Sequence, residues 1–187
     1  MLKREARRPP SGSAPLLALL LILTLAWPAL AASAAPAGEW AAVLFVNDGD
    51  TISVRLAGRK ELVRLLGVDA PETGHSLKLG RVAAQAGRTT QEEARLGRMA
   101  RDFVLGLLPR PSRVRLAGDP RAGERDKYGR LLAYVYLEDG RMLNELLLDA
   151  GQARVYRHCR CAGLGRFQAL EAQARRERRG LWALGGP

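Results

Sequence analysis

The sequence predicts an α+β fold that is mainly β with helices: a five-stranded Greek-key barrel of the OB type with three α-helices. Short apolar runs of strand-forming residues occur five times, and three of them precede the first clear helical repeat. The resulting order, βββ-α-ββ-α-α, lacks the regular alternation of strand and helix that a parallel sheet requires. Five strands with the helices set apart therefore fit a small closed barrel.

The first three predicted strands follow one another closely. They are Trp40–Val46, Thr51–Leu56 and Glu61–Val68, and Ala57-Gly58 forms the turn between the second and the third. Because only a few residues separate these runs, an antiparallel meander is the simplest interpretation.

The next segment lacks any clear period. Residues 73–88 are polar and contain glycine, so we expect a long, mobile loop there. A helix follows, with a capping box formed by Thr90 and Glu93 at its start. Apolar residues then repeat at helical spacing as far as Leu107, and Pro109 ends the helix.

Two further strands and two helices complete the predicted domain. The strands are Arg113–Ala117 and Leu131–Leu137. The helices are Arg141–Asp149, closed by Gly151, and Gly165–Arg178, with Gly180 just beyond its end.

The N-terminal residues have the features of an export signal. A basic start is followed by an uncharged run from Leu16 to Trp27 and by the small-x-small sequence Ala29-Leu30-Ala31. Twelve helical residues span about 18 Å, less than the roughly 30 Å of a bilayer core, although an uncleaved anchor is the alternative. We predict a signal peptide at 1–31, a disordered lead-in at 32–39 and a folded domain at 40–184. The protein would then be periplasmic or secreted, without stable membrane association after cleavage.

The charge balance is strongly basic. The whole chain carries 30 Lys and Arg against 19 Asp and Glu, a formal charge of +11. Removing residues 1–31 takes away four basic residues and one acidic residue, which leaves +8 on 156 residues. Such an excess attracts polyanions such as nucleic acid; an anionic membrane surface or simple solubility would explain it equally well.

The chain has two cysteines, Cys159 and Cys161, which exclude a scaffold of several disulfides. With His158 they offer three zinc ligands, but a structural zinc site needs four in a spaced pattern. A local disulfide or an intermolecular one is the other interpretation in an oxidising compartment.

Two groups of charged residues interrupt the first strands. Asp48, Gly49 and Asp50 precede the second strand, and counting by twos places Asp50 on the face of Ile52 and Val54. A carboxylate at the rim of an apolar face is costly unless it is paired or bound to a metal. Alone, however, the Asp-Gly pair is typical of a hairpin turn. Arg64 projects from the third strand, where a half-buried guanidinium would need a carboxylate or phosphate partner.

Two more groups follow. Asp69-Ala70-Pro71-Glu72 gives two carboxylates on a segment stiffened by proline, and hard divalent cations take carboxylate and carbonyl oxygens as ligands. The segment Asp126–Arg130 contains Lys127, Tyr128 and Arg130, which suit a phosphate and a base. Taken singly, these groups are surface turns.

The combination of these motifs is more specific than any one of them. Asp-Gly-Asp-Thr, Arg-Leu-Leu-x-Val-Asp-x-Pro-Glu and Asp-Lys-Tyr-Gly-Arg occur in this order, and the C-terminal Gly180-Leu181-Trp182 follows. The chain thereby resembles the staphylococcal nuclease (thermonuclease) family from about Val43 to Trp182. The family fold, an OB-type barrel with three helices, agrees with the predicted order of elements.

The resemblance implies a role for each motif residue. Asp50, Asp69 and the backbone carbonyl of Ala70 would hold Ca²⁺. Glu72 would act as general base on water, and Arg64 and Arg130 would stabilise the phosphoryl group in the transition state. Lys127 and Tyr128 would contact the terminal phosphate of the nucleotide, and Asp48 matches a supporting carboxylate.

The resemblance also implies an activity: a sugar-nonspecific nuclease that cleaves DNA and RNA to 3′-phosphate ends. A metal site with only two side-chain carboxylates would bind weakly, so we expect a requirement for added calcium. The alternative is a catalytically silent OB module that binds single-stranded nucleic acid, a module that would have no need of Glu72 beside a metal cage. We expect a monomer.

Overall fold

The computed structural model describes residues 38–74, 77–85 and 87–184 of the 187-residue chain. The predicted signal peptide at 1–31 and residues 32–37 of the predicted lead-in lie outside the described residues. Glu39, the last residue of that lead-in, already belongs to the first strand. Within the described ranges, no helix combines the length and the apolar character needed to cross a membrane.

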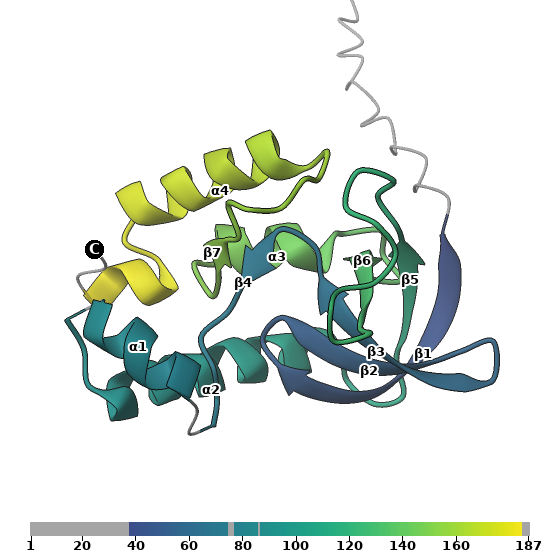
Figure 1. Ribbon diagram of the computed structural model, residues 1–187, viewed down its shortest axis with the longest axis horizontal. Coiled ribbons are helices and arrows are strands. Elements are labelled where there is room, and N and C mark those ends of the chain that lie inside the picture. Colours follow the sequence, from purple (N-terminus) through teal and green to yellow (C-terminus); the bar gives the residue numbers. More distant parts are fainter. Residues whose placement is uncertain (1–37, 75–76, 86, 185–187) are drawn as a thin grey trace, which may run out of the picture. The chain divides into compact units, whose positions relative to one another are not determined.

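Five strands close into a barrel, as the sequence predicted (Figure 1). Their order around the barrel is β1-β2-β3-β6-β5, with β3 parallel to β6 and the other neighbours antiparallel. Side chains that are fully buried fill its interior, because alternate residues of each strand point inward. The strands are β1 (Glu39–Asp48), β2 (Thr51–Leu56), β3 (Arg59–Leu65), β5 (Arg113–Ala117) and β6 (Leu131–Tyr136).

The β2–β3 hairpin turns at Ala57 and Gly58, the two residues predicted for it. Both have positive φ, 45° and 80°, which is the backbone twist that suits a two-residue hairpin loop. The pairing of β2 with β3 then runs from Leu56 and Arg59 to Thr51 and Arg64 without a shift in register.

The predicted third strand, Glu61–Val68, was too long at its end. Strand β3 stops at Leu65, and Val68 and Asp69 form a separate strand, β4 (Val68–Asp69), which pairs with β7 (Arg154–Val155). Between them, Gly67 has a φ of 73° and lies against the ring of Phe167, so the chain leaves the barrel at this point.

The helices lie beside the barrel, with α2 packed against β1 and α3 against β6, while β4 and β7 form a small separate sheet next to α4 (Figure 1). The three predicted helices are present, with the first as α2 (Thr90–Leu107). The other two are shorter than predicted: α3 (Leu143–Asp149) and α4 (Leu164–Arg176). A 3-10 helix, η1 (Gly180–Leu184), follows at the C-terminal side.

The expectation of a loop at residues 73–88 was wrong, because that segment contains a fourth helix, α1 (Leu77–Gln85). Leu79 and Ala83, four residues apart, are buried, so the helix has an apolar face. Gly80 and Arg81 lie between these two residues and obscure the period in the sequence. Residues 75, 76 and 86 of the predicted loop are outside the described ranges.

The capping box of α2 lies one residue earlier than predicted. Thr89 is the N-cap: its side chain accepts from the backbone N–H of Glu92, while the Glu92 carboxylate accepts from the backbone of Thr89. Glu93 cannot be the partner in this box because it is fully buried and pairs with Arg88 and Arg154.

The two cysteines are joined in a disulfide between Cys159 and Cys161, with their Cα atoms 5.3 Å apart. The bond lies in the loop between β7 and α4, and Cys161 is buried in the main core. Both sulfur atoms are used in this bond, so the zinc interpretation of this segment is wrong.

Candidate functional site

Asp50 occupies the turn between β1 and β2, and it is buried, with 7% of its surface exposed. Its carboxylate accepts two hydrogen bonds from the protein. The hydroxyl of Thr51 donates to Oδ1 at 2.9 Å, and the backbone N–H of Ala70 donates to Oδ2 at 2.7 Å. The second bond fixes the Asp69–Ala70 segment against the turn, although twenty residues separate Asp50 from Ala70 in the sequence.

Arg64 bridges two carboxylates. Its Nη1 lies 2.5 Å from Oδ2 of Asp50, and its Nη2 lies 2.9 Å from Oδ1 of Asp69. The register of the hairpin explains this position, because Arg64 pairs directly with Thr51, the residue after Asp50. The planar fork of a guanidinium suits two acceptors at once, so Arg64 sets the spacing of the two carboxylates.

Burial raises the pKa of Asp50 because water no longer stabilises the charged form. Arg64 and the Ala70 amide act against this effect without cancelling it, and the neighbouring charge of Asp69 adds to it. A further positive charge next to Asp50 and Asp69 would therefore stabilise the ionised form of Asp50.

Two glycines allow the site to pack closely on α2. A Cβ at Gly49 would lie 2.7 Å from the Cβ of Ala100 and 2.8 Å from that of Ala70. A Cβ at Gly97 would overlap the backbone carbonyl oxygen of Glu72. Because neither glycine has a side chain, the Asp50 turn and the segment that carries Glu72 both lie directly on α2.

Glu72 borders a small hollow next to Asp69. The hollow is lined by Asp69, Ala70, Pro71, Glu72, Leu79, Val82, Glu93 and Arg154. Glu72 therefore lines the same hollow as Asp69, a predicted side-chain ligand, and Ala70, the predicted backbone ligand. Helix α1, which the sequence did not reveal, contributes part of the wall.

The sequence also gave no indication of the role of Glu93. Its carboxylate lies 3.3 Å from Arg88 and 3.3 Å from Arg154, the residue that pairs with Asp69 between β7 and β4. Arg88 in turn donates to the carbonyl of Leu181 in η1. Glu93 thus connects α2, the strand beside Asp69 and the C-terminal segment; the only signal was a second glutamate in the first turn of the helix.

Asp48 supports the site from the other side of the turn. It accepts a hydrogen bond of 2.5 Å from the hydroxyl of Thr73, directly after Glu72. The segment 69–73 is thereby held at both ends, by Asp50 and by Asp48.

The segment Asp126–Arg130 forms a turn that leads into β6. Asp126 accepts from the backbone N–H of Tyr128 and of Arg130, and its Oδ2 lies 2.7 Å from Nε of Arg130. These bonds lower the pKa of Asp126, although partial burial raises it. The ring of Tyr128 is 72% exposed, with Lys127 Nζ 5.0 Å from its centroid.

Arg130 enters β6 beside β3, since Leu131 and Leu132 pair with Val63 and Arg64. Its guanidinium pairs with Asp126 rather than with Asp50 or Asp69. The structure thus brings Asp50, Arg64, Asp69 and Ala70 into direct contact. Glu72 lines one hollow with Asp69 and Ala70, and Arg130, Lys127 and Tyr128 lie on the turn that leads into β6.

The donor set fits a hard divalent cation. Two carboxylates lie within 3 Å of one guanidinium, and the carbonyl of Ala70 follows Asp69 directly. Such oxygen donors are those that Ca²⁺ uses. Among the described residues, no cluster of three or more His, Cys, Asp or Glu side chains is placed to hold a metal, so a cation here would have two carboxylate ligands and open positions.

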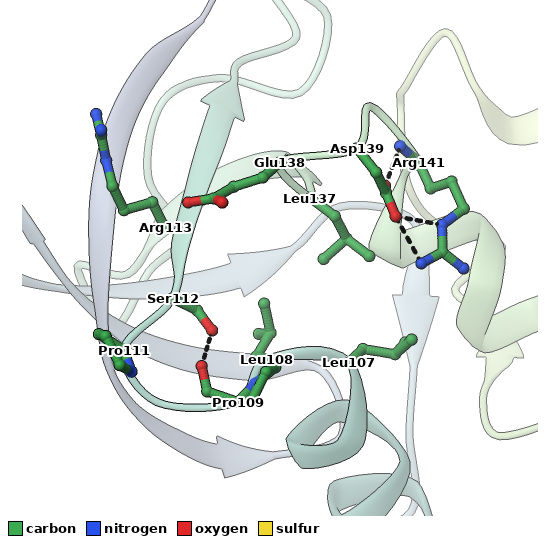
Figure 2. A pocket seen from close by; sticks show the side chains of 10 residues that line it. All are labelled: Leu107, Leu108, Pro109, Pro111, Ser112, Arg113, Leu137, Glu138, Asp139 and Arg141. Carbon is green, nitrogen blue, oxygen red and sulfur yellow. Dashed lines mark hydrogen bonds and ion pairs between the residues drawn. The ribbon is translucent and has the colours of Figure 1, made fainter.

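A second hollow lies elsewhere, between the end of α2 and the loop after β6 (Figure 2). Its rim carries an ion pair between Arg141 and Asp139, with Nη2 and Oδ2 2.6 Å apart. None of the predicted site residues lines this hollow.

The sequence of this chain matches known proteins of one family. The model of the staphylococcal nuclease homologues matches residues 62–184. Endonuclease YncB of Bacillus subtilis is 33% identical over 142 residues, which cover 74% of this chain and 59% of that protein. The chain therefore spans about three-fifths of the length of YncB.

Two further relatives are more similar to this chain in length. An uncharacterized endonuclease of Escherichia coli O157:H7 is 29% identical over 171 residues, 90% of each chain. The uncharacterized protein MJ1439 of Methanocaldococcus jannaschii is 34% identical over 146 residues, 75% of this chain and 70% of that protein. The chain thus belongs to the family of staphylococcal nuclease homologues.

Proposed function

We propose that this protein is an exported nuclease that hydrolyses phosphodiester bonds of DNA and RNA in a Ca²⁺-dependent reaction and leaves 3′-phosphate ends. The observation that carries the proposal is the pair of carboxylates on Asp50 and Asp69, bridged by Arg64 beside the hollow of Glu72. Family membership and the names of the relatives, endonucleases in two cases, support the class of reaction.

Asp50, Asp69 and the carbonyl of Ala70 are the residues that would hold Ca²⁺. When bound, the ion would polarise a phosphoryl oxygen and neutralise part of the charge that develops there. Arg64 already lies between the two carboxylates, so its guanidinium would face a phosphate next to them. Arg64 thereby orients the scissile phosphate through its fork of N–H donors.

Glu72 is the proposed general base. It takes the proton from a water molecule whose oxygen attacks phosphorus, while the bond from phosphorus to the 5′ oxygen breaks. The 5′ oxygen leaves as a hydroxyl after it takes a proton from solvent water, and the phosphate stays on the 3′ side. A positioned base of this kind typically accelerates a reaction by about 10²–10⁴-fold.

Arg130, Lys127 and Tyr128 are proposed to bind the phosphates from the turn that leads into β6. Arg130 is bound to Asp126 through a single ion pair in an exposed turn, so it can exchange that partner for a phosphate oxygen. Positively charged donors aimed at a developing charge stabilise the transition state by about 3–4 kcal/mol each.

The test is the digestion of plasmid DNA and of RNA by the purified protein, with calcium and then with EGTA. We expect cleavage of both only with calcium, and product ends from which a phosphatase releases 3′ phosphate. Equal cleavage in EGTA would overturn the metal requirement. Binding of single strands without cleavage would favour the silent OB module.

The role of Glu72 is tested by Glu72→Gln, with Glu124→Gln as the matched control. The Glu124 side chain is 79% exposed and does not line the hollow that Glu72 borders. We expect Glu72→Gln to lower kcat by at least about 100-fold, with Glu124→Gln unaffected. Equal turnover of Glu72→Gln and the wild-type protein would exclude Glu72 as the base.

Export is tested by N-terminal sequencing of the protein from periplasm and medium. A start near Ala32 is expected. A start at Met1 in a cytosolic fraction would contradict the export proposal. Size-exclusion chromatography with light scattering tests the expected monomer.

A further inference from the structure

The outer face of β3 leads away from the site. In the unbroken register of the hairpin, Arg64 pairs with Thr51 and Lys60 pairs with Arg55. Alternate residues of a strand face the same side, so Arg64, Leu62 and Lys60 form a line on the outside of the barrel. At about 3.3 Å per residue, Lys60 lies about 13 Å from Arg64 along the strand.

A row of basic residues crosses the barrel at the end of this line. Lys60 pairs with Arg55, Arg55 with Ala42, and Ala42 with Arg113, so the row extends over β3, β2, β1 and β5. All three basic side chains are exposed. Within residues 38–74, 77–85 and 87–184, none of the three forms an ion pair, so their charges are available to a polyanion.

Two aromatic rings lie on the same face, on either side of this row. Phe45 pairs with Ser53 and is 50% exposed, and Lys60 reaches across β2 to within 5.6 Å of its ring centroid. Trp40 is 44% exposed, with the guanidinium of Arg113 5.2 Å from its ring. Exposed rings of this size suit a partner with flat apolar faces.

Little negative charge opposes the row. Arg113 shares a hollow with Glu138, but Figure 2 shows the Arg113 side chain extending away from that hollow. Glu61, on β3, forms an ion pair with Arg125, in which Oε2 of Glu61 lies 2.8 Å from Nη1 of Arg125. The face is therefore basic as well as aromatic.

We infer that this face, called here the basic-aromatic track and made of Trp40, Phe45, Arg55, Lys60, Leu62 and Arg113, binds the part of a single-stranded nucleic acid that extends beyond the scissile bond. Lys60, Arg55 and Arg113 contact phosphates, while bases stack on Phe45 and Trp40. The inference rests on the proposed function, since it extends the substrate path from the Arg64 site.

The partner is a single strand because stacking on a protein ring requires a base that is free of its neighbours. Duplex bases present no free π-face, so rings exposed beside a row of basic residues favour a single strand over a duplex. The track gives the enzyme a longer contact with its substrate than the cleavage site alone.

The binding test uses a labelled single strand of twelve nucleotides in EGTA, which prevents cleavage. One variant, Trp40→Ala/Phe45→Ala, removes the rings, and another, Arg55→Gln/Lys60→Gln, removes two charges. The control is Arg176→Gln/Arg178→Gln, which removes two exposed charges at the end of α4. Fluorescence anisotropy at several salt concentrations measures Kd.

Removal of the rings should raise Kd by about fivefold or more for each stacked base. Removal of two track charges should reduce the slope of log Kd against log salt by about 1.4, since each phosphate contact on a single strand contributes about 0.7. The control should change neither value. Track variants that bind like the control would overturn the inference, and so would track-dependent binding of anionic vesicles without binding of the single strand.

A kinetic comparison separates this inference from the proposed function. With calcium, the track variants should raise KM for the twelve-nucleotide strand and leave hydrolysis of a dinucleotide with one phosphodiester bond unchanged. Equal losses on both substrates would place the residues in the cleavage site and overturn the inference. If the wild-type protein cleaves neither substrate, the proposed function fails, while the binding test still decides on the track.

Discussion

Two aspartates, Asp50 and Asp126, each form an ion pair with an arginine, yet their surroundings have opposite effects. Burial raises the pKa of Asp50 in spite of Arg64. At Asp126, burial also raises the pKa, but hydrogen bonds from Arg130 and two backbone amides together have a larger, opposite effect. The net result is a lowered pKa. The surroundings of Asp50 therefore disfavour its charged form, whereas those of Asp126 stabilise the charged form.

The difference comes from how each partner is supplied. Asp50 is bound by Arg64 and Ala70, fourteen and twenty residues away, so its site exists only when β3 has paired with β2 and the segment after β4 lies against the turn. The hydrogen bonds that the Asp126 carboxylate accepts come from Tyr128 and Arg130, no more than four positions away. The two halves of the candidate site thus differ in kind: one is a fixed, desolvated pair of carboxylates, and the other is a local turn with exchangeable contacts.

The largest expected effect is the contrast between Arg64→Gln and Arg130→Gln. Both should lower kcat/KM by about 10²–10³-fold, because each removes a donor to the phosphoryl group. Arg64→Gln should also lower the free energy of unfolding by about 3 kcal/mol in EGTA, because it leaves Asp50 buried without its charged partner. Arg130→Gln should cost less than about 1 kcal/mol, because its ion pair is partly exposed.

Urea denaturation in EGTA measures this difference in stability, and initial rates with calcium measure the loss of activity. Equal losses of stability in the two variants would show that the two halves of the site are built alike. Calcium should raise the free energy of unfolding of the wild-type protein, because it binds the folded state. It should not raise that of a variant without a functional carboxylate pair.

A second contrast lies within α2. Gly97→Ala places a Cβ on the carbonyl oxygen of Glu72 and should cost about 1–3 kcal/mol, with a fall in kcat because Glu72 moves. Gly106→Ala in the same helix meets no atom within 4 Å and should stabilise the protein by about 0.5–1 kcal/mol without a change in activity. Thermal unfolding of both variants tests whether the site is fixed by close packing; a harmless Gly97→Ala would show that it is not.

Elements with an obvious local period were predictable from the sequence. Strands β2 and β5 have the bounds that their apolar alternation indicates, and the hairpin turn lies where Ala57-Gly58 places it. Helix α1 was missed because, among residues 79–85, where burial is described, two residues, Leu79 and Ala83, mark its buried face. The end of β3 was missed because it depends on the contact of Gly67 with Phe167, one hundred residues away.

The site shows the same limit. The order of motifs indicated that Asp50, Arg64 and Asp69 belong together, and they are in contact. That Arg64 bridges the two carboxylates follows only from the barrel register. The ion pairs of Glu93 with Arg88 and Arg154 depend on the packing of three distant segments, so local capping chemistry gave the wrong interpretation of this residue.

The smallest expected effect tests the local half of the site through pH. A lowered native pKa means that Asp126 contributes stability above its unfolded pKa of about 3.9, and that this contribution disappears as pH falls through the native pKa. Asp126→Asn should therefore cost about 1 kcal/mol at pH 7, an amount that shrinks below about pH 4. It should also raise KM a few-fold, because Arg130 and Tyr128 lose their anchor.

The matched control is Asp139→Asn, since Asp139 forms a similar turn with Arg141 outside the candidate site, and there KM should not change. If Asp126→Asn lowers stability equally at pH 7 and at pH 3, the ionised carboxylate is not what holds the turn, and the contrast with Asp50 fails.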